Sequence, residues 1–359
     1  MAIKMNSNLK IYKDKKILIT GSTGFKGSWL AIWLKNMGAE VYGYALKPIT
    51  KKDNFVVSGL EKKIIQEYGD IRNYKKLDSF IRKINPNIIF HLAAQPIVKE
   101  SYENPLETLE TNVMGTANLL DICKNNSNIK VVINVTSDKC YLNLDENRLF
   151  TEDDKLGGKD VYSASKACSE IINYAYYNSF FKDKNLSIAS VRAGNVIGGG
   201  DWQNSRIVPD SIRAYESKKE LLIRMPNATR PWQHVLEPLM GYLLLAASMY
   251  REPKQYDGAW NFGPSTRKNL TVGELVSRIS SQFKDLKYKT INNDIYEPNY
   301  LRLSSLKAKK QLKWKKILTD KEMVYLIADW YLNYEKDDMY SLCSQQIEYY
   351  LKRYNARSN

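Results

Sequence analysis

Cysteine and histidine are scarce in this chain, with four and two residues among 359. No two cysteines have the Cys-x-x-Cys spacing, so we expect neither a disulfide framework nor a bound metal. Apolar runs of about eighteen residues are also missing, which argues against a membrane-spanning helix. Residues 1–16 are polar and contain no apolar signal core, so we expect a cytoplasmic protein with reduced thiols.

Acidic residues are outnumbered, because 39 Asp and Glu stand against 54 Lys and Arg, a net charge of +15. Such a surplus makes nucleic acid a possible partner, and a regulatory protein that binds nucleic acid is one interpretation. However, the lysines are spread along the chain, and its densest basic run, at 307–316, contains no aromatic–basic RNA signature. A small substrate that carries phosphates fits the surplus equally well, and we expect no nucleic-acid partner.

Apolar runs alternate with amphipathic stretches along the first part of the chain. Short apolar or β-branched runs predict buried parallel strands at 16–20, 40–46, 64–71, 85–94, 130–138 and 186–198. Apolar residues at helical spacing predict helices at 26–38, 104–126, 160–180, 326–338 and 347–355. The alternation predicts an α/β fold with a doubly wound, Rossmann-type parallel sheet, followed by a smaller C-terminal α/β lobe.

Three glycines stand between the first predicted strand and the first predicted helix, in the sequence GSTGFKG. Glycine costs about 0.5–1 kcal/mol relative to alanine inside an element, so the bare backbone must serve a purpose. A pyrophosphate can rest on the N–H groups of a helix only where no Cβ intervenes, and a glycine turn between strand and helix meets that need. We therefore expect a dinucleotide cofactor at the turn residues Gly21, Thr23, Gly24, Phe25, Lys26 and Gly27.

The choice between NAD and NADP is left open by the second predicted strand. An acidic residue usually ends this strand and binds the ribose 2′-hydroxyl of NAD, but the stretch VYGYALKP contains none and has Lys47 near its end. After the third strand, Asp70 is expected to bind the adenine amino group, with Ile71 beside it. An N-cap of the following helix is an equally good role for Asp70.

Tyr162 and Lys166 lie four residues apart at the start of a predicted helix, so they share one face. Ser137 ends the fifth predicted strand, at the edge where open α/β sheets bind ligands. A phenol with a pKa of about 10 is a poor base at neutral pH, but a nearby ammonium and a positive nicotinamide ring lower that pKa. We therefore expect Lys166 to lower the pKa of Tyr162, which then removes an alcohol proton while hydride leaves the same carbon.

The chain resembles the nucleotide-sugar branch of the extended short-chain dehydrogenase/reductase family. The resemblance runs from the first strand nearly to the C-terminus, through the stretches TGSTGFKGSWL, HLAAQP, TSDKCY, LGGKDVYSASK, RAGNVIGGGDW, RPWQHVLEPLMGYLLLA and WNFGP. It implies an NAD-dependent 4,6-dehydratase that turns CDP-glucose into CDP-4-keto-6-deoxyglucose and water for deoxysugar synthesis. The alternative is another nucleotide-sugar 4,6-dehydratase or a 4-epimerase, with dTDP-glucose, GDP-mannose or a UDP-sugar as substrate.

The resemblance also implies roles for the catalytic residues. Tyr162 acts on the C4 hydroxyl, Lys166 holds the nicotinamide ribose, and Ser137 orients the C4 oxygen. Asp138 is expected to protonate the departing C6 hydroxyl. Lys139 stands where relatives have Glu, and we expect it to be the base that removes the C5 proton, which requires burial to favour the neutral amine. A simple pairing of Lys139 with the substrate or with Asp138 is the alternative.

Further binding candidates follow the other predicted strands and lie in the C-terminal half. The small residues after the fourth strand suit the cofactor ribose, and the cofactor candidates there are Leu92, Ala93, Ala94 and Asn112. Arginine forks suit the two phosphates of the substrate, although most arginines are surface residues. The substrate candidates are Gln95, Asn195, Arg206, Arg230 and Arg302.

These positions predict two domains along the chain. We place a dinucleotide-binding domain at 1–195 and a substrate-binding lobe at 196–359, with some interleaving of the chain between them. The resemblance implies a homodimer or homotetramer, with interface helices that follow Asn112 and Tyr162.

Overall fold

The computed structural model describes residues 7–264, 269–290 and 301–356. Its centre is a seven-stranded sheet in the order β11-β7-β5-β4-β1-β2-β3, and all neighbouring strands in it are parallel. These strands are β1 (Lys16–Thr20), β2 (Glu40–Ala45), β3 (Ile65–Tyr68), β4 (Ile88–His91), β5 (Val131–Val135), β7 (Ser187–Arg192) and β11 (Gly258–Asn261). The predicted α/β fold with a doubly wound parallel sheet is confirmed.

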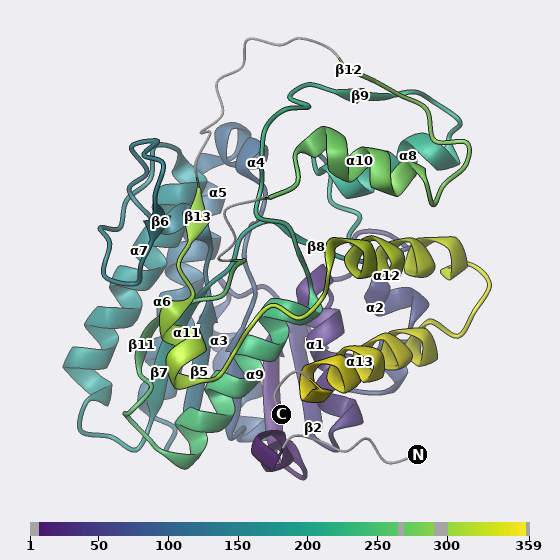
Figure 1. Ribbon diagram of the computed structural model, residues 1–359. Helices are drawn as coiled ribbons and strands as arrows, with labels where there is room; N and C mark the ends of the chain where they lie inside the picture. Colours follow the sequence, from purple (N-terminus) through teal and green to yellow (C-terminus); the bar gives the residue numbers. More distant parts are fainter. Residues whose placement is uncertain (1–6, 265–268, 291–300, 357–359) are drawn as a thin grey trace.

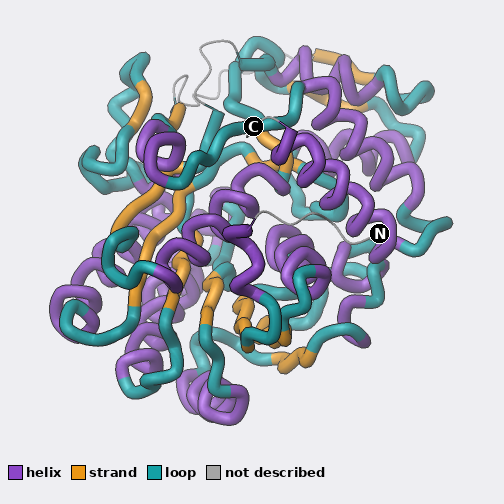
Figure 2. The backbone as a smooth tube through the Cα atoms, turned by 60° about the horizontal axis from the view of Figure 1, so that its bottom comes forward, coloured by secondary structure: helices purple, strands orange, loops and turns teal. Residues whose placement is uncertain are grey.

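Helices cover both faces of this sheet (Figure 1; Figure 2). In the described ranges they are α1 (Phe25–Asn36), α2 (Asn54–Val57), α3 (Tyr74–Ile84), α4 (Val98–Glu103), α5 (Pro105–Leu109), α6 (Gly115–Lys124), α7 (Val161–Tyr176), α8 (Ile207–Glu216), α9 (Leu236–Arg251), α10 (Val272–Ser280), α11 (Leu306–Gln311), α12 (Asp320–Asn333) and α13 (Met339–Ala356). None of these helices is long and apolar enough to cross a membrane.

Alternation along β1 divides its side chains between two cores. Ile17 and Ile19 belong to the core that α1, α9, α12 and α13 complete, whereas Leu18 belongs to the core formed with α3 and α6. All three side chains are fully buried. A strand that is buried on both faces has a continuous apolar sequence, which is why KILIT predicts this strand correctly.

The C-terminal half adds a smaller group of elements, of which α8, α10, β9 and β12 lie together at the upper right of Figure 1. The described ranges also contain three two-stranded parallel sheets. They are β8 (Val196–Ile197) with β10 (Gln233–His234), β9 (Leu221–Ile223) with β12 (Tyr288–Thr290), and β6 (Leu149–Phe150) with β13 (Arg302–Leu303). The chain also returns to the main sheet, because β11 pairs with β7 and α9 packs on β5 and β7. The domain boundary at residue 195 stays a prediction.

Several helices differ from the sequence prediction, and among them the helix predicted at 347–355 is α13, which begins at Met339. Helix α3 is not predicted, and the helix predicted at 104–126 is interrupted by a π-helical turn, Glu110–Met114, between α5 and α6. The tail helix predicted at 326–338 is α12, which begins earlier and ends earlier. A capping box sets its start, since the Thr319 hydroxyl accepts the Glu322 N–H at 3.2 Å and the Glu322 carboxylate accepts the Thr319 N–H at 2.8 Å.

A buried carboxylate on α9 anchors the C-terminal helices. Glu237 accepts hydrogen bonds from the N–H groups of Ile317 and Leu318, at 2.8 and 2.7 Å, and from the Tyr350 hydroxyl at 2.8 Å. Burial raises the pKa of Glu237 to about 7. These contacts join α9 to α13 and to the segment that precedes α12.

Candidate active site

The glycine turn joins β1 to α1 at the point where the strand order reverses. β2 and β3 extend the sheet from one side of β1, and β4, β5, β7 and β11 extend it from the other. Ligands of doubly wound sheets bind in the crevice at such a switch point. Gly24 precedes α1, and no side chain caps the first turn, so the N–H groups there have no side-chain acceptor. They fit a pyrophosphate group.

Steric contacts show that the three glycines have different tasks. Gly21 has a φ of +73°, and a Cβ on it would lie 2.8 Å from the backbone nitrogen of Ala93. A Cβ on Gly27 would lie 2.1 Å from the Gly21 carbonyl oxygen. Gly24 is exposed, and a Cβ there would approach only that same oxygen, at 3.3 Å. The fold therefore requires Gly21 and Gly27, whereas Gly24 leaves room for a ligand at the helix N-terminus.

Two other residues of the turn have partners within the protein. The Thr23 hydroxyl donates to the Leu46 carbonyl at 2.9 Å, and the Phe25 ring packs on Gly198, where a Cβ would meet it at 3.0 Å. The segment after β4 lies against the turn, since the Ala93 N–H donates to the Thr20 hydroxyl at 3.2 Å. Half-buried in this segment are the three predicted ribose contacts, Leu92, Ala93 and Ala94.

At the end of β3, Asp70 forms an ion pair with Arg72. The Arg72 Nε donates to both carboxylate oxygens at 3.0 Å, which lowers the pKa of Asp70. The N-cap of α3 is Asn73, whose side chain accepts the Lys76 N–H at 3.1 Å. The alternative role of Asp70 as that N-cap is therefore wrong, and its contact with adenine stays a prediction. The Ile71 side chain is buried in the core of α3 and α6.

Asn112 and Gln95 bind each other. The Asn112 Oδ1 accepts the Gln95 N–H at 2.8 Å, and its Nδ2 donates to the Gln95 carbonyl at 3.1 Å and to the Ser165 hydroxyl at 2.8 Å. The Gln95 side chain donates to the Thr108 hydroxyl at 2.7 Å. Asn112 therefore ties the loop after β4 to α7, from within the π-helical turn. Such turns are frequent at functional sites. Direct contacts of these two side chains with cofactor or substrate stay predictions.

The catalytic candidates converge at the end of β5 and the first turns of α7. Ser137, Asp138, Tyr162 and Lys166 are 7%, 4%, 8% and 6% exposed. The Ser137 hydroxyl donates to Asp138 Oδ1 at 3.0 Å, and its interaction with the Tyr162 phenol lowers the pKa of that phenol. Helix α7 is capped by Asp160 and thus presents Tyr162 on its second residue. The structure brings four of the five predicted catalytic residues into one buried cluster.

Burial governs the ionisation of Tyr162. It raises the pKa of Tyr162 to about 12, whereas the hydrogen bond with Ser137 and the charge of Arg206 lower it. Arg206 is thus a cation that favours the phenolate, and the effect expected of Lys166 on this pKa stays a prediction. Burial and the charge of Lys26 lower the pKa of Lys166 to about 8.

Asp138 occupies the space in front of Gly194. A Cβ on Gly194 would lie 1.7 Å from Oδ2 of Asp138, so no side chain at 194 is compatible with this position of the carboxylate. Burial raises the pKa of Asp138, against the opposing effects of the Lys139 charge and the Ser137 hydrogen bond. A carboxyl group in this state keeps its proton to higher pH, which suits a general acid. Lys139 itself is only half-buried, so the burial expected for it is incomplete.

Lys26 faces this cluster, although the sequence suggests only a cofactor contact. Burial and the charge of Arg206 lower the pKa of Lys26 to about 8, against the opposing charges of Asp138 and Asp201. It also acts on Lys166 across the site. The signal that identifies Lys26 is its place in the first turn of α1, next to the glycine turn.

Arg206 reaches the cluster with the help of a glycine-rich loop. Its guanidinium forms an ion pair with Asp201 at 2.8 Å. The Tyr331 hydroxyl donates to the Asp201 carbonyl at 2.6 Å, and Trp330 packs so closely on Gly199 that a Cβ there would meet its ring at 2.0 Å. Helix α12 therefore fixes the loop that orients Arg206. Asp201 is a site residue that sequence reasoning missed, and the run GGGDW is its only local signal.

The other substrate candidates lie in the surrounding loops. Asn195 has a φ of +51° in the turn after β7, a conformation that asparagine tolerates. Arg302 donates to Asn147 Oδ1 at 2.5 Å, and its buried Nε has no hydrogen-bond partner in the described ranges. Arg230 donates to the Thr229 carbonyl at 3.0 Å. Contacts of these residues with a substrate stay predictions.

A glycine turn at the switch point and a buried Ser, Tyr and Lys set at the sheet edge define an extended short-chain dehydrogenase/reductase. A family model described as GDP-mannose 4,6 dehydratase matches residues 18–327, and the chain belongs to this family. The CDP-glucose 4,6-dehydratase of Salmonella typhimurium is 42% identical over 342 residues, which cover 93% of this chain and 95% of that enzyme.

Solved structures support the fold. An epimerase from Methanothermobacter thermautotrophicus has a TM-score of 0.79 and 21% identity, over 94% of this chain and 96% of its own. A UDP-glucuronic acid 4-epimerase from Bacillus cereus, in complex with UDP-glucuronic acid and NAD, has a TM-score of 0.75 and 21% identity, over 88% and 99% of the two chains. At this level of identity, the likeness concerns the arrangement of strands and helices.

The contact between Gly194 and Asp138 predicts the effect of an added methyl group. We expect Gly194→Ala to push the carboxylate toward solvent, to bring the pKa of Asp138 back toward its ordinary value and to cost about 1–3 kcal/mol of the free energy of unfolding. Urea denaturation and NMR titration of 13C-labelled aspartate measure both effects. In the control Gly263→Ala, the nearest atom, Cβ of Leu303, would be 3.3 Å away, so we expect a smaller loss. Equal stability of the two variants and an unchanged Asp138 pKa would contradict the argument.

Proposed function

We propose that this protein converts CDP-glucose to CDP-4-keto-6-deoxyglucose and water, a step toward deoxysugars. The observation that carries the proposal is the buried cluster of Ser137, Asp138, Tyr162 and Lys166, in a chain 42% identical to a CDP-glucose 4,6-dehydratase over 93% of its length. We place the reaction in the cytoplasm, because the four cysteines are free thiols, which suits a reducing compartment.

NAD is the cofactor that we propose. When bound, it supplies a hydride acceptor for C4 of the sugar, a donor for C6, and a positive ring that favours a nearby phenolate. The uncapped first turn of α1 beside Gly24 suits its pyrophosphate, and Lys166 suits the nicotinamide ribose. The NAD complex of the Bacillus cereus epimerase supports a nicotinamide dinucleotide. NADP is the alternative, because no acidic residue ends β2 and Lys47 is exposed beyond it.

Tyr162 is the proton acceptor for the C4 hydroxyl. A phenol with a pKa of about 12 is protonated at neutral pH, so positive charge must favour the phenolate before Tyr162 can take that proton. Arg206 supplies such a charge from the loop side. The Ser137 hydroxyl, which lowers the pKa of this phenol, is proposed to hold the C4 oxygen beside it.

Asp138 favours dehydration over epimerisation at C4. Epimerisation oxidises C4 and reduces it again, so it needs no acid at C6, whereas loss of the C6 hydroxyl as water needs a proton at that oxygen. Asp138 is buried next to Ser137, and burial raises its pKa, so it can carry that proton. Other nucleotide-sugar 4,6-dehydratases share this requirement, and the assay below distinguishes them.

Two amines are available to remove the C5 proton, which becomes acidic once C4 is a ketone. Lys139 follows Asp138 directly, and its charge acts on that carboxyl group. Lys26 approaches from α1 with a pKa of about 8, so a substantial fraction of it is neutral at physiological pH. We keep Lys139 as the proposed base, because it extends the segment that carries Ser137 and Asp138.

The remaining polar residues are assigned to the substrate by their place around this cluster. Arg206 is the best-supported phosphate ligand, because it lies close enough to Tyr162 to act on its pKa and is held by Asp201. Arg230 and Arg302 are the further phosphate candidates. Asn195 and Gln95 are proposed to contact the sugar.

A comparison of CDP-glucose, dTDP-glucose and GDP-mannose tests the proposed substrate. We expect only CDP-glucose to give a 4-keto product, which is detected by its absorbance in base. Tyr162→Phe should lower turnover by about 10²–10⁴-fold, because no phenol takes the C4 proton. Tyr349→Phe, on the exposed side of α13, is the control and should retain full turnover. Conversion of only dTDP-glucose or GDP-mannose would refute the substrate, and full activity of Tyr162→Phe would refute the mechanism.

Lys139→Ala tests the base at C5. We expect its turnover of CDP-glucose to fall about 10²-fold or more, because proton removal from C5 becomes slow. Substrate with deuterium at C5 should then show a primary isotope effect in the variant. Lys26→Ala is measured alongside as the other amine of the site. Unchanged turnover of Lys139→Ala removes Lys139 from the mechanism, and an isotope effect in Lys26→Ala alone would assign the base to Lys26.

We also propose a homodimer, built on the outer faces of α7 and of α5, which precedes Asn112, in place of the expected helix that follows Asn112. On these helices Leu106, Ile171 and Tyr174 are 73%, 54% and 72% exposed, and Tyr102 on the adjoining α4 is 70% exposed. Helices α4 and α5 pack against α7, so their apolar residues can form one surface. The inner face of α7 carries Tyr162 and the rest of the cluster, so a second copy would cover the helix from behind. A homotetramer is the alternative.

A charged residue on this surface should separate the copies. We expect the protein to have twice the chain mass of 41.5 kDa in solution, and Leu106→Asp combined with Tyr174→Asp to halve that mass. Light scattering after size-exclusion chromatography measures it. The control is Leu222→Asp, which places the same charge at an apolar residue on β9 that is 54% exposed. A monomeric unmodified protein would refute the dimer.

A further inference from the structure

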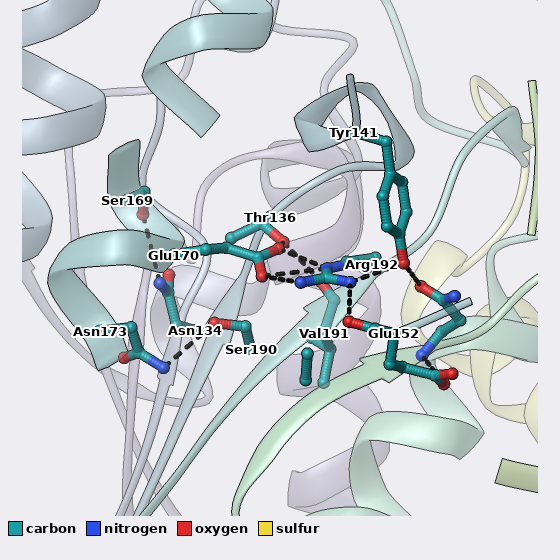
Figure 3. A network of polar contacts seen from close by, with 12 residues as sticks. Asn134, Thr136, Tyr141, Glu152, Ser169, Glu170, Asn173, Ser190, Val191 and Arg192 are labelled. Carbon is teal, nitrogen blue, oxygen red and sulfur yellow. Dashed lines mark hydrogen bonds and ion pairs between the residues drawn. The ribbon is translucent and has the colours of Figure 1, made fainter. Parts of the chain in front are cut away.

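A buried ion pair lies beside the catalytic cluster (Figure 3). Glu170 on α7 and Arg192 at the end of β7 are 5% and 2% exposed. The Arg192 Nε donates to the two carboxylate oxygens at 2.8 and 3.0 Å, and its Nη2 also donates to Oε2. Thr136, which follows β5, donates its hydroxyl to Glu170 Oε1 at 2.6 Å. One carboxylate therefore joins α7 to the ends of two strands.

Arg192 extends this network to the segment that begins at Ser137. Its Nη1 donates to the Tyr141 hydroxyl at 2.6 Å, and that hydroxyl donates to Asn261 Oδ1 at 2.8 Å (Figure 3). Asn261 ends β11, the edge strand of the sheet. The loop that carries Asp138 is therefore held at its start by β5 and at its end by Tyr141.

Glu170 shares one face of α7 with the catalytic residues. Tyr162, Lys166 and Glu170 follow each other at intervals of four residues, so they lie along one side of the helix. The ion pair with Arg192 fixes how far along its axis α7 sits relative to the sheet. It also fixes which side of α7 faces Ser137.

We propose that Glu170 and Arg192 are positioning residues, which hold the Tyr162–Lys166 face of α7 against the segment that carries Ser137 and Asp138. Any test of this inference that measures turnover of CDP-glucose rests on the proposed function. A misplacement of about 1 Å in reacting groups can cost about 10²-fold in rate, so loss of the ion pair should appear in kcat.

The carboxylate of Glu170 has a second effect, on the charge of Lys166. Burial and the charge of Lys26 lower the pKa of Lys166 to about 8, against the effects of Cys140 and of the negative charge of Glu170, which raise it. His91, at the end of β4, also faces Lys166. Burial, and to a smaller extent the charge of Lys166, lower the pKa of His91 to about 3, so the imidazole is neutral. Removal of the Glu170 charge should therefore lower the Lys166 pKa, and the ammonium would be lost at lower pH.

Glu170→Gln tests the proposal, because it keeps the shape of the side chain and removes its charge. We expect kcat for CDP-glucose to fall about tenfold or more and KM to change less than about twofold. The alkaline limb of the pH profile should move to lower pH. Tyr141→Phe removes one hydrogen bond of Arg192 without a change of charge. It should lower kcat less and leave the alkaline limb in place.

Glu237→Gln is the matched control, because it removes a buried carboxylate on α9 that contacts the C-terminal helices. It should retain the pH profile of the unmodified protein, because Glu237 is not among the charges that act on Tyr162 or Lys166. If Glu170→Gln retains both the kcat and the pH profile of the unmodified protein, the proposal is overturned. If Glu170→Gln fails to fold, Tyr141→Phe decides: an unchanged kcat overturns the proposal, and a lower kcat at constant KM supports it.

A titration of Lys166 separates this inference from the proposed function. The NMR signal of 13C-lysine-labelled protein, assigned with Lys166→Arg, reports the Lys166 pKa without any substrate. We expect a lower pKa in Glu170→Gln than in the unmodified protein and in Glu237→Gln. Equal values would overturn the electrostatic part of the proposal. Failure of the unmodified protein to convert CDP-glucose would count against the proposed function alone.

Discussion

Burial of ionisable groups at the carboxyl edge of one parallel sheet is the constraint on which this structure depends. Removing one partner of a buried ion pair typically costs about 3–5 kcal/mol, so the charges at this edge must be matched within the fold. Glu170 and Arg192 neutralise each other's charge in this way beside the catalytic cluster. The same burial keeps Tyr162 protonated and lowers the pKa of Lys166 to about 8. Stability and reactivity at this edge are therefore set by the same exclusion of water.

Glycines make this close packing possible at several separate points. Gly21 lets the turn after β1 touch the turn after β4, Gly27 lets the first turn of α1 pack on Gly21, and Gly199 lets Trp330 cover the loop that holds Arg206. Gly194 gives its side-chain space to the carboxyl group of the proposed acid. Each of these glycines removes a Cβ where backbone or a functional group takes its place. The sequence shows where glycines stand, but only the tertiary contacts show which of them serve a ligand.

Sequence reasoning predicts the parts of the site that are local in the chain. The glycine turn and the Tyr-x-x-x-Lys pair each lie within a few residues, and apolar runs reveal six of the seven strands in the main sheet. Residues defined by contacts between distant segments are missed: Asp201, which orients Arg206, and the pair of Glu170 with Arg192. The contact of Asn112 with Gln95 is missed for the same reason, because Gln95 follows another strand. β11 carries too short a signal to be predicted as the seventh strand.

The return of the chain from the C-terminal half to the main sheet has a consequence for catalysis. Asn261 of β11 binds Tyr141, which binds Arg192, and Trp330 of α12 covers Gly199 next to the ion pair of Asp201. Elements beyond residue 195 thus support the catalytic edge from two sides. The substrate recognition proposed for this half and the geometry of the proposed reacting groups therefore share contacts. A change that shifts β11 or α12 reaches the proton-transfer residues through hydrogen bonds that the structure shows, so specificity and rate in this fold are physically coupled.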